Sequence, residues 1–283
     1  MKKSILFTIL TLYILTSCEK NDREVFFKIG KDLEYKFGDI ELYDTSTNII
    51  YFKTLHDEFS NIDKNSFVFL DNGDAIYSGT FWPGYSSSGP TGPFIYSPPS
   101  LYGNYALRIE NWSPDKPDVR SDPRIIALLK QHDLLHSGLS VSSISIEING
   151  PQLSLKFTVS NNDQSDLLIL DPDKTGLNLF HYFTNGLIVF DSANNEVFSS
   201  SIQPQVPDPW NSWNIDWLSK LKSGESKDFN IIYTINNPLN PGEYRISFAF
   251  PGLKYQITRD QLYQDNSRIW LGDKRINKKI NIP

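Results

Sequence analysis

Hydrophobic and polar residues alternate along most of the chain, and this alternation predicts strands. In residues 152–161, Leu153, Leu155, Phe157 and Val159 alternate with polar side chains. A period of two is typical of a strand with one buried face. The chain repeats this pattern in short runs separated by turn residues, which predicts a mainly β protein. The runs are residues 38–53, 66–81, 104–112, 141–148, 152–161, 166–170, 186–198, 225–235, 242–250 and 267–272.

Two of these runs also carry the signals of a hairpin. Residues 40–52 contain a polar turn at Asp44–Asn48 between two alternating halves. Residues 66–81 are divided by Asn72-Gly73, a dipeptide that readily adopts the positive φ of a tight turn. We therefore expect two antiparallel hairpins before residue 82.

An aromatic, proline-rich stretch follows the hairpins at residues 82–103. It contains five prolines and four glycines, which predicts a loop without regular structure. Prolines lower the entropy lost when a loop is ordered and aromatic rings offer contact area, so this loop is a candidate binding site. The alternative is that its rings cover the end of a sheet sandwich. The candidate binding residues are Trp82, Tyr85, Phe94, Tyr96 and Tyr102.

A second aromatic stretch, residues 205–221, contains Trp210, Trp213 and Trp217. Exposed tryptophans suit stacking on sugars or contact with a protein. Trp213 and Trp217 are also four residues apart, as on a short helix packed against a core. Both interpretations remain open from the sequence.

One helix is predicted between the two halves of the chain. Asp122 can cap its start, Pro123 suits the first helical position, and Gly138 suits the position after the last turn. In such a helix His132 and His136 would lie on one side and could share a zinc ion. The zincin motif requires a glutamate after the first histidine, where this chain has Asp133, and a third ligand nearby. His132 also continues the apolar stripe, which favours a packing role over a metal site.

Residues 171–176, with the sequence DPDKTG, are similar to the start of a calcium loop. The twelfth position would be Tyr182, where such a loop needs a bidentate glutamate. We therefore expect a turn between strands here.

The second half of the chain resembles an Ig-like β-sandwich of the BsuPI type found in exported bacterial proteins. The resemblance depends on a turn at Ser223-Gly224-Glu225 before one strand and a turn at Pro241-Gly242-Glu243-Tyr244 before the next. Ser223 stands where that family commonly has proline. The resemblance implies a sandwich fold and no particular activity.

These patterns predict two β-sandwich-like modules, the second of them Ig-like, joined by a proline-rich linker and one short helix. The expected boundaries are residues 25–113 for the first β module, 114–139 for the linker and helix, and 140–283 for the second β module. Residues 1–17 and 18–24 precede them as a signal peptide and a tether.

The N-terminus resembles the signal of a bacterial lipoprotein. Lys2 and Lys3 precede an apolar run that is too short to span a bilayer, and Leu15-Thr16-Ser17-Cys18 follows it. The resemblance implies cleavage before Cys18 and acylation of its thiol. Two or three acyl chains anchor a protein stably. The charged residues after Cys18 loosely resemble surface-export signals of Bacteroidota, so we expect the outer membrane and leave the leaflet open.

Charge and cysteine content narrow the classes of function. The formal net charge is −6, and −8 without Lys2 and Lys3, which argues against nucleic acid as a partner. Cys18 is the only cysteine, so no internal disulfide is possible. No phosphate-binding loop, dinucleotide fingerprint or nucleophile-elbow motif is present, and we expect no cofactor.

The sequence therefore predicts a lipid-anchored, non-enzymatic protein of the cell envelope that binds a protein or a glycan through aromatic loops. One alternative is an inhibitor or immunity-type lipoprotein that uses residues 82–102. Another is a zinc hydrolase that uses His132 and His136.

Overall fold

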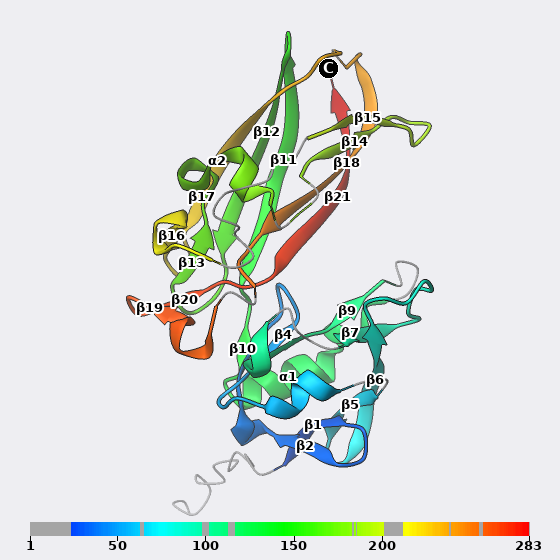
Figure 1. Cartoon of the computed structure of the whole chain (residues 1–283), viewed down its shortest axis with the longest axis vertical. Coiled ribbons are helices and arrows are strands. Elements are labelled where there is room, and N and C mark those ends of the chain that lie inside the picture. Colours follow the sequence, from blue (N-terminus) through cyan, green and yellow to red (C-terminus); the bar gives the residue numbers. More distant parts are fainter. Residues whose placement is uncertain are drawn as a thin grey trace, which may run out of the picture.

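The computed structural model of the chain is mainly β, as the alternation predicts (Figure 1). The described part contains two short α-helices and several 3-10 turns. The structure describes residues 24–62, 65–97, 102–112, 117–182, 184, 186–200, 212–237, 239–254 and 257–282. Cys18, the leader and Trp210 lie outside the described residues. Among the helices of the described part, none is long and apolar enough to cross a membrane.

The first half of the chain forms one sandwich-like module from two sheets. A six-stranded sheet in the order β2-β1-β5-β6-β7-β9 faces a four-stranded sheet in the order β10-β3-β4-β8. Both predicted hairpins are confirmed, as β3–β4 and β5–β6, and Asn72 and Gly73 have the positive φ values of a tight turn. The strands are β1 (Val25–Ile29), β2 (Leu33–Lys36), β3 (Ile40–Asp44), β4 (Ile49–Phe52), β5 (Ser66–Asp71), β6 (Asp74–Pro83), β7 (Pro93–Ser97), β8 (Ala106–Arg108), β9 (Glu110–Asn111) and β10 (Leu135–His136).

The second half forms a sandwich from a three-stranded sheet, β11-β12-β17, and a four-stranded sheet, β15-β14-β18-β21. Aromatic rings join the two sheets, since Phe157 on β12 lies 5.1 Å from Phe248 on β18, between ring centroids. A further sheet, β16-β13-β20-β19, adjoins them. The strands are β11 (Leu139–Asn149), β12 (Gln152–Asn161), β13 (Leu167–Leu170), β14 (Ile188–Phe190), β15 (Glu196–Ser199), β16 (Leu218–Leu221), β17 (Ser226–Thr234), β18 (Gly242–Pro251), β19 (Tyr263–Gln264), β20 (Ser267–Ile269) and β21 (Asp273–Ile282).

The two modules lie one above the other along the long axis of the molecule and meet at the four-stranded sheet of the first module (Figure 1). One face of that sheet belongs to the core of the first module, for example through Ile50 and Phe52. Its other face belongs to the core of the second module, for example through Ile49 and Tyr51. All four residues of β4 are therefore buried, whereas alternation predicts one exposed face. We call this contact region the junction.

The predicted helix begins where the sequence indicates but ends earlier. Helix α1 spans Pro123–Gln131, and the Asp122 side chain accepts a hydrogen bond from the Arg124 N–H at its start. Asp133 has a φ of 55°, and the Leu134 N–H donates to the Leu129 carbonyl at 2.8 Å, which closes a Schellman motif. The prediction that the helix continues to Gly138 is wrong, because Asp133 already supplies the left-handed residue that terminates it. His136 lies beyond the helix on β10, which pairs with β3 in parallel.

The prediction of a structureless loop at 82–103 is wrong in part. Strand β6 extends to Pro83, and β7 pairs with it in parallel, beginning where Thr80 lies opposite Phe94. Pro93 is tolerated because it is the first residue of its strand. Gly79 allows the close approach, since a Cβ there would lie 2.4 Å from the Pro93 carbonyl oxygen.

Two further elements differ from the sequence prediction. Residues 171–176 form one helical turn at the start of α2 (Pro172–Phe180), whose N-cap is Asp171 and which is interrupted at Gly176, where φ is 70°. The strongly charged segment after Gly272 forms the ten-residue strand β21 at the edge of its sheet. Edge strands of natural sheets often carry lysines, which discourage pairing with other chains and hide the apolar alternation in the sequence.

Candidate functional site

His132 and His136, which are four residues apart in the sequence, do not form a metal site. The His132 ring stacks on Phe37, with centroids 3.7 Å apart and planes 3° apart, and it is buried. His136 lies 2.7 Å from Asp163, between Nδ1 and Oδ1. The prediction that both lie on one side of a helix is wrong because α1 ends at Gln131. Within the described residues, no group of three or more His, Cys, Asp or Glu side chains is placed to hold a metal ion.

The aromatic residues of the first predicted loop occupy different environments. Phe94 and Tyr102 are buried, and the Tyr102 hydroxyl accepts a hydrogen bond from Arg108 at 3.1 Å. Tyr85 is 80% exposed. Trp82 and Tyr96 are partly buried partners across β6 and β7. The structure therefore does not bring the five residues together as one exposed surface.

The tryptophans of the second predicted loop pack on the protein itself. Trp213 and Trp217 are partly buried against the core of the second module. Trp217 ends a single 3-10 turn, Ile215–Trp217, directly before β16. Packing is thus the interpretation that the structure favours for these two rings.

A different aromatic group forms around Trp112, which is not among the predicted binding residues. Its ring is 46% exposed and lies edge-on to Phe94, with centroids 4.9 Å apart. Tyr96 completes the group, with its centroid 6.1 Å from that of Trp112 and 5.2 Å from that of Phe94. We call Phe94, Tyr96 and Trp112 the aromatic patch. Trp112 directly follows β9 and precedes the proline-rich linker, so its position at the end of a strand was the only signal in the sequence.

The aromatic patch adjoins a cavity of about 340 Å³ at the junction, which we call the junction cleft. Cavities of ~300–1,000 Å³ are the usual size of ligand sites. Polar and charged side chains predominate in its wall, and both modules contribute to it. The lining residues are Thr45, Ser46, Thr47, Asn48, Arg108, Glu110, Asn111, Trp112, Asp118, Arg120, Ser121, Asp273, Lys274 and Arg275.

Five charged residues meet beside the cleft around the Asp273 carboxylate. Arg108 donates two hydrogen bonds of 3.0 Å to it, one to each oxygen. Arg275 contacts it at 3.2 Å and Lys254 at 3.7 Å. Glu110 lies 3.1 Å from the Arg108 Nε, without hydrogen-bond geometry, and 3.7 Å from the Arg275 Nη2. We call these five residues the Asp273 cluster.

The pKa values in this cluster follow from burial and charge. Burial alone raises the pKa of Asp273, but Arg108, Arg275 and Lys254 hold the pKa of that carboxyl well below its usual value. Burial lowers the pKa of the Lys254 ammonium, an effect that Asp273 opposes and that Arg108 and Arg275 reinforce. Burial also raises the pKa of the Tyr96 hydroxyl, and nearby Glu110 adds to this effect. Arg275 and Arg108 oppose the effect of Glu110 on the pKa of Tyr96.

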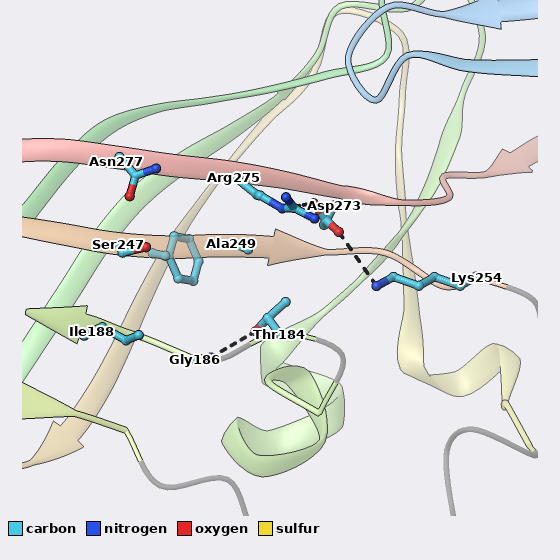
Figure 2. A pocket seen from close by; sticks show the side chains of 10 residues that line it. Thr184, Gly186, Ile188, Ser247, Ala249, Lys254, Asp273, Arg275 and Asn277 are labelled. Carbon is cyan, nitrogen blue, oxygen red and sulfur yellow. Dashed lines mark hydrogen bonds and ion pairs between the residues drawn. The ribbon is translucent and has the colours of Figure 1, made fainter. Parts of the chain in front are cut away.

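A second cavity, of about 440 Å³, lies on the outer face of the sheet β15-β14-β18-β21, and we call it the sheet groove. Figure 2 shows Ser247 and Ala249 on β18 beside Arg275 and Asn277 on β21, with Lys254 extending toward Asp273. The groove and the junction cleft share Asp273 and Arg275 as lining residues. The two cavities thus adjoin at the Asp273 cluster.

Another group of charges at the junction is closed to solvent. Arg268, which is 1% exposed, contacts Asp44 at 2.9 Å and Asp163 at 3.1 Å. Asp163 also contacts His136, and the Asp44 carboxylate accepts hydrogen bonds from the N–H and the hydroxyl of Ser46. Burial opposes the effect, but His136 and Arg268 hold the pKa of Asp163 well below its usual value. We call Arg268, Asp44, Asp163 and His136 the Arg268 cluster.

No protein-family model matches the chain, and no curated protein sequence is significantly similar to it.

Proposed function

We propose that the protein is a non-enzymatic, lipid-anchored receptor of the cell envelope that binds a carbohydrate at the aromatic patch and the junction cleft. The observation that carries the proposal is the half-exposed Trp112 ring, which Phe94 and Tyr96 support from the side at the mouth of a polar cleft.

The two parts of this surface match the two parts of a sugar. The apolar face of a pyranose ring stacks on an aromatic ring, and the hydroxyl groups at its edge need both donors and acceptors of hydrogen bonds. The cleft offers a donor on Arg275, an acceptor on Asp118, and both on Asn111. Because the supporting rings are packed, Trp112 loses little conformational entropy on binding.

The anchoring part of the proposal depends on Cys18, with its thiol acylated after removal of residues 1–17. Mass spectrometry of the protein, purified from a bacterial host that processes lipoproteins, tests this part. We expect acyl chains on Cys18 and loss of membrane association in Cys18→Ser, and an unmodified thiol with the leader still attached would contradict it.

A glycan array with wild type and Trp112→Ala tests the binding part. Loss of a packed aromatic anchor typically weakens binding by more than ~10-fold, so we expect the signals of wild type to disappear in the variant. Tyr85→Ala is the matched control, since Tyr85 is an exposed aromatic residue that does not line the cleft. Unchanged signals in Trp112→Ala would contradict the proposal.

A second candidate function is contact with a protein through residues 84–92. The observation that favours it is Tyr85, the most exposed of the large hydrophobic side chains in the described part of the chain at 80%. Tyr85→Ala then abolishes binding to that protein and leaves the glycan signals intact. The two functions are therefore separated by the same pair of variants.

A further inference from the structure

The register of three strands builds the sheet groove. Ile188 pairs with Ser247, Ser247 pairs with Asn277, and Ala249 pairs with Arg275. Paired residues project to the same side of a sheet, so these side chains share the outer face. The small side chains of Ser247 and Ala249 form the floor, and Arg275 and Asn277 rise along one side (Figure 2).

The groove ends at the Asp273 cluster, which carries one more positive than negative charge. The Asp273 cluster contains three cations, Arg108, Lys254 and Arg275, and two carboxylates, Asp273 and Glu110. The side chains of all but Arg275 are about nine-tenths buried, with exposed fractions of 6–11%. These four buried side chains are two cations and two carboxylates, so the excess positive charge belongs to Arg275, which is 53% exposed and accessible to an anion from solvent.

Two of the three cations can meet an anionic ligand group in the groove. Lys254 and Arg275 both line it, whereas Arg108 does not. Among the described residues that line the groove, Asp273 is the one carboxylate, and Arg108, Arg275 and Lys254 already contact it. The groove therefore favours a ligand group with a single negative charge.

We propose that the sheet groove is a subsite for an anionic substituent of the bound saccharide, a carboxylate or a sulfate ester, held between Lys254 and Arg275. The ligand is then an acidic saccharide that passes over the Arg275 side chain, which lines both cavities. One sugar unit stacks on Trp112 in the junction cleft, and the adjacent charged sugar unit lies in the sheet groove. This inference rests on the proposed carbohydrate function, which it narrows to one class of ligand.

A matched set of ligands tests the charge requirement by calorimetric titration of the full-length mature protein. The set consists of a uronic-acid oligosaccharide, the same oligosaccharide with its carboxyl groups reduced to alcohols, and the reduced form with sulfate esters. Charge-assisted hydrogen bonds are about twice as strong as neutral ones, so we expect the uronate or the sulfated form to bind at least ~10-fold tighter than the reduced form. The tighter of the two identifies the source of the charge.

Variants locate the effect in the groove. Arg275→Gln, at a 53% exposed position, and Lys254→Met are expected to remove most of the preference for the charged ligand. Lys279→Gln is the control, because Lys279 lies on the same strand but outside the groove and pairs with Glu243. Trp112→Ala is expected to lower the affinity for the charged and the reduced ligands by the same factor. If Lys254→Met does not fold, Arg275→Gln alone decides.

The outcomes separate this inference from the proposed function. Equal affinity for charged and reduced ligands, with both lost in Trp112→Ala, overturns the groove subsite and leaves carbohydrate binding in place. A preference that survives Arg275→Gln also overturns the subsite. Absence of binding to all three ligands and to every glycan on the array overturns both proposals.

Discussion

The Arg268 cluster and the Asp273 cluster are built alike but differ in what surrounds them. Each joins an arginine to aspartate across the junction, with partners more than a hundred residues apart in the chain. Arg268 is 1% exposed, and two carboxylates, those of Asp44 and Asp163, contact its guanidinium, so the Arg268 cluster has no excess of cations. The Asp273 cluster has more cations than carboxylates and borders two cavities. The comparison indicates that the first cluster holds the modules together, whereas the second is available to a ligand.

The largest expected effect is on stability, from Arg268→Met. Removing one partner of a buried ion pair leaves uncompensated charge, so we expect the free energy of unfolding to fall by about 3–5 kcal/mol. Arg275→Gln, in the other cluster, should change it by less than about 0.5 kcal/mol because the side chain is half exposed. Urea unfolding measures both. Similar losses for the two variants would remove the distinction between the clusters.

Gly138→Ala is expected to disturb the Arg268 cluster through its geometry. Gly138 has a φ of 58°, and a Cβ there would lie 2.3 Å from the Asp44 Oδ1. We expect a loss of about 3 kcal/mol, from backbone strain and crowding together. Gly150→Ala is the control, since its φ is 59° with open space around the Cβ, and it should lose only about 1 kcal/mol. Equal losses in urea unfolding would show that strain alone is responsible.

Acid should weaken both clusters. The pKa values of Asp163 and Asp273 are held below their unfolded value of about 3.9. A carboxyl with a lowered folded pKa contributes stability that is present above the unfolded pKa and is lost as the pH falls below it. Between pH 5 and pH 3 we expect the free energy of unfolding to fall by about 2 kcal/mol for the two groups together. In Asp163→Asn the fall should be about half as large, and an unchanged pH profile in that variant would contradict the assignment.

The smallest expected effect is a pH dependence of binding that belongs to the Asp273 cluster alone. The pKa of Lys254 is lowered by burial, and an anion in the sheet groove would favour its charged form. Affinity for the acidic saccharide should therefore decrease roughly threefold to tenfold as the pH rises from 7 to 10. Lys254→Met should remove this dependence in calorimetric titrations. A dependence of the same size in the variant would assign it to another group.

The sequence predicts the β class, both hairpins and the start of α1, because each depends on neighbouring residues. Asn72-Gly73 fixes a turn locally, and Asp122 caps a helix locally. It does not predict the end of α1, because the left-handed residue that terminates the helix is Asp133. Glycine is the usual residue in this conformation and aspartate adopts it only occasionally, so the sequence favours Gly138 instead. The error in the end of α1 therefore arises because an aspartate can either continue a helix or terminate it.

The candidate site was largely hidden in the sequence for a physical reason. Arg108, Glu110 and Arg275 alternate in strands as exposed residues do, and only the packing of one module on the other buries the first two. Strand β21, which carries Asp273 and Arg275, was missed because its charged edge obscures its alternation. The predicted aromatic loop contributed Phe94 and Tyr96 to the patch, while Trp112, the exposed ring, lies outside that loop.

Hydrogen–deuterium exchange with and without a saccharide selected on the array tests the central claim most directly. We predict slower exchange in residues 108–112 and 273–277, which form the junction cleft and the sheet groove, and no change in β20, which carries Arg268. Protection confined to residues 84–92, or no protection in either of the two predicted segments, would contradict the claim that the Asp273 cluster is the ligand site.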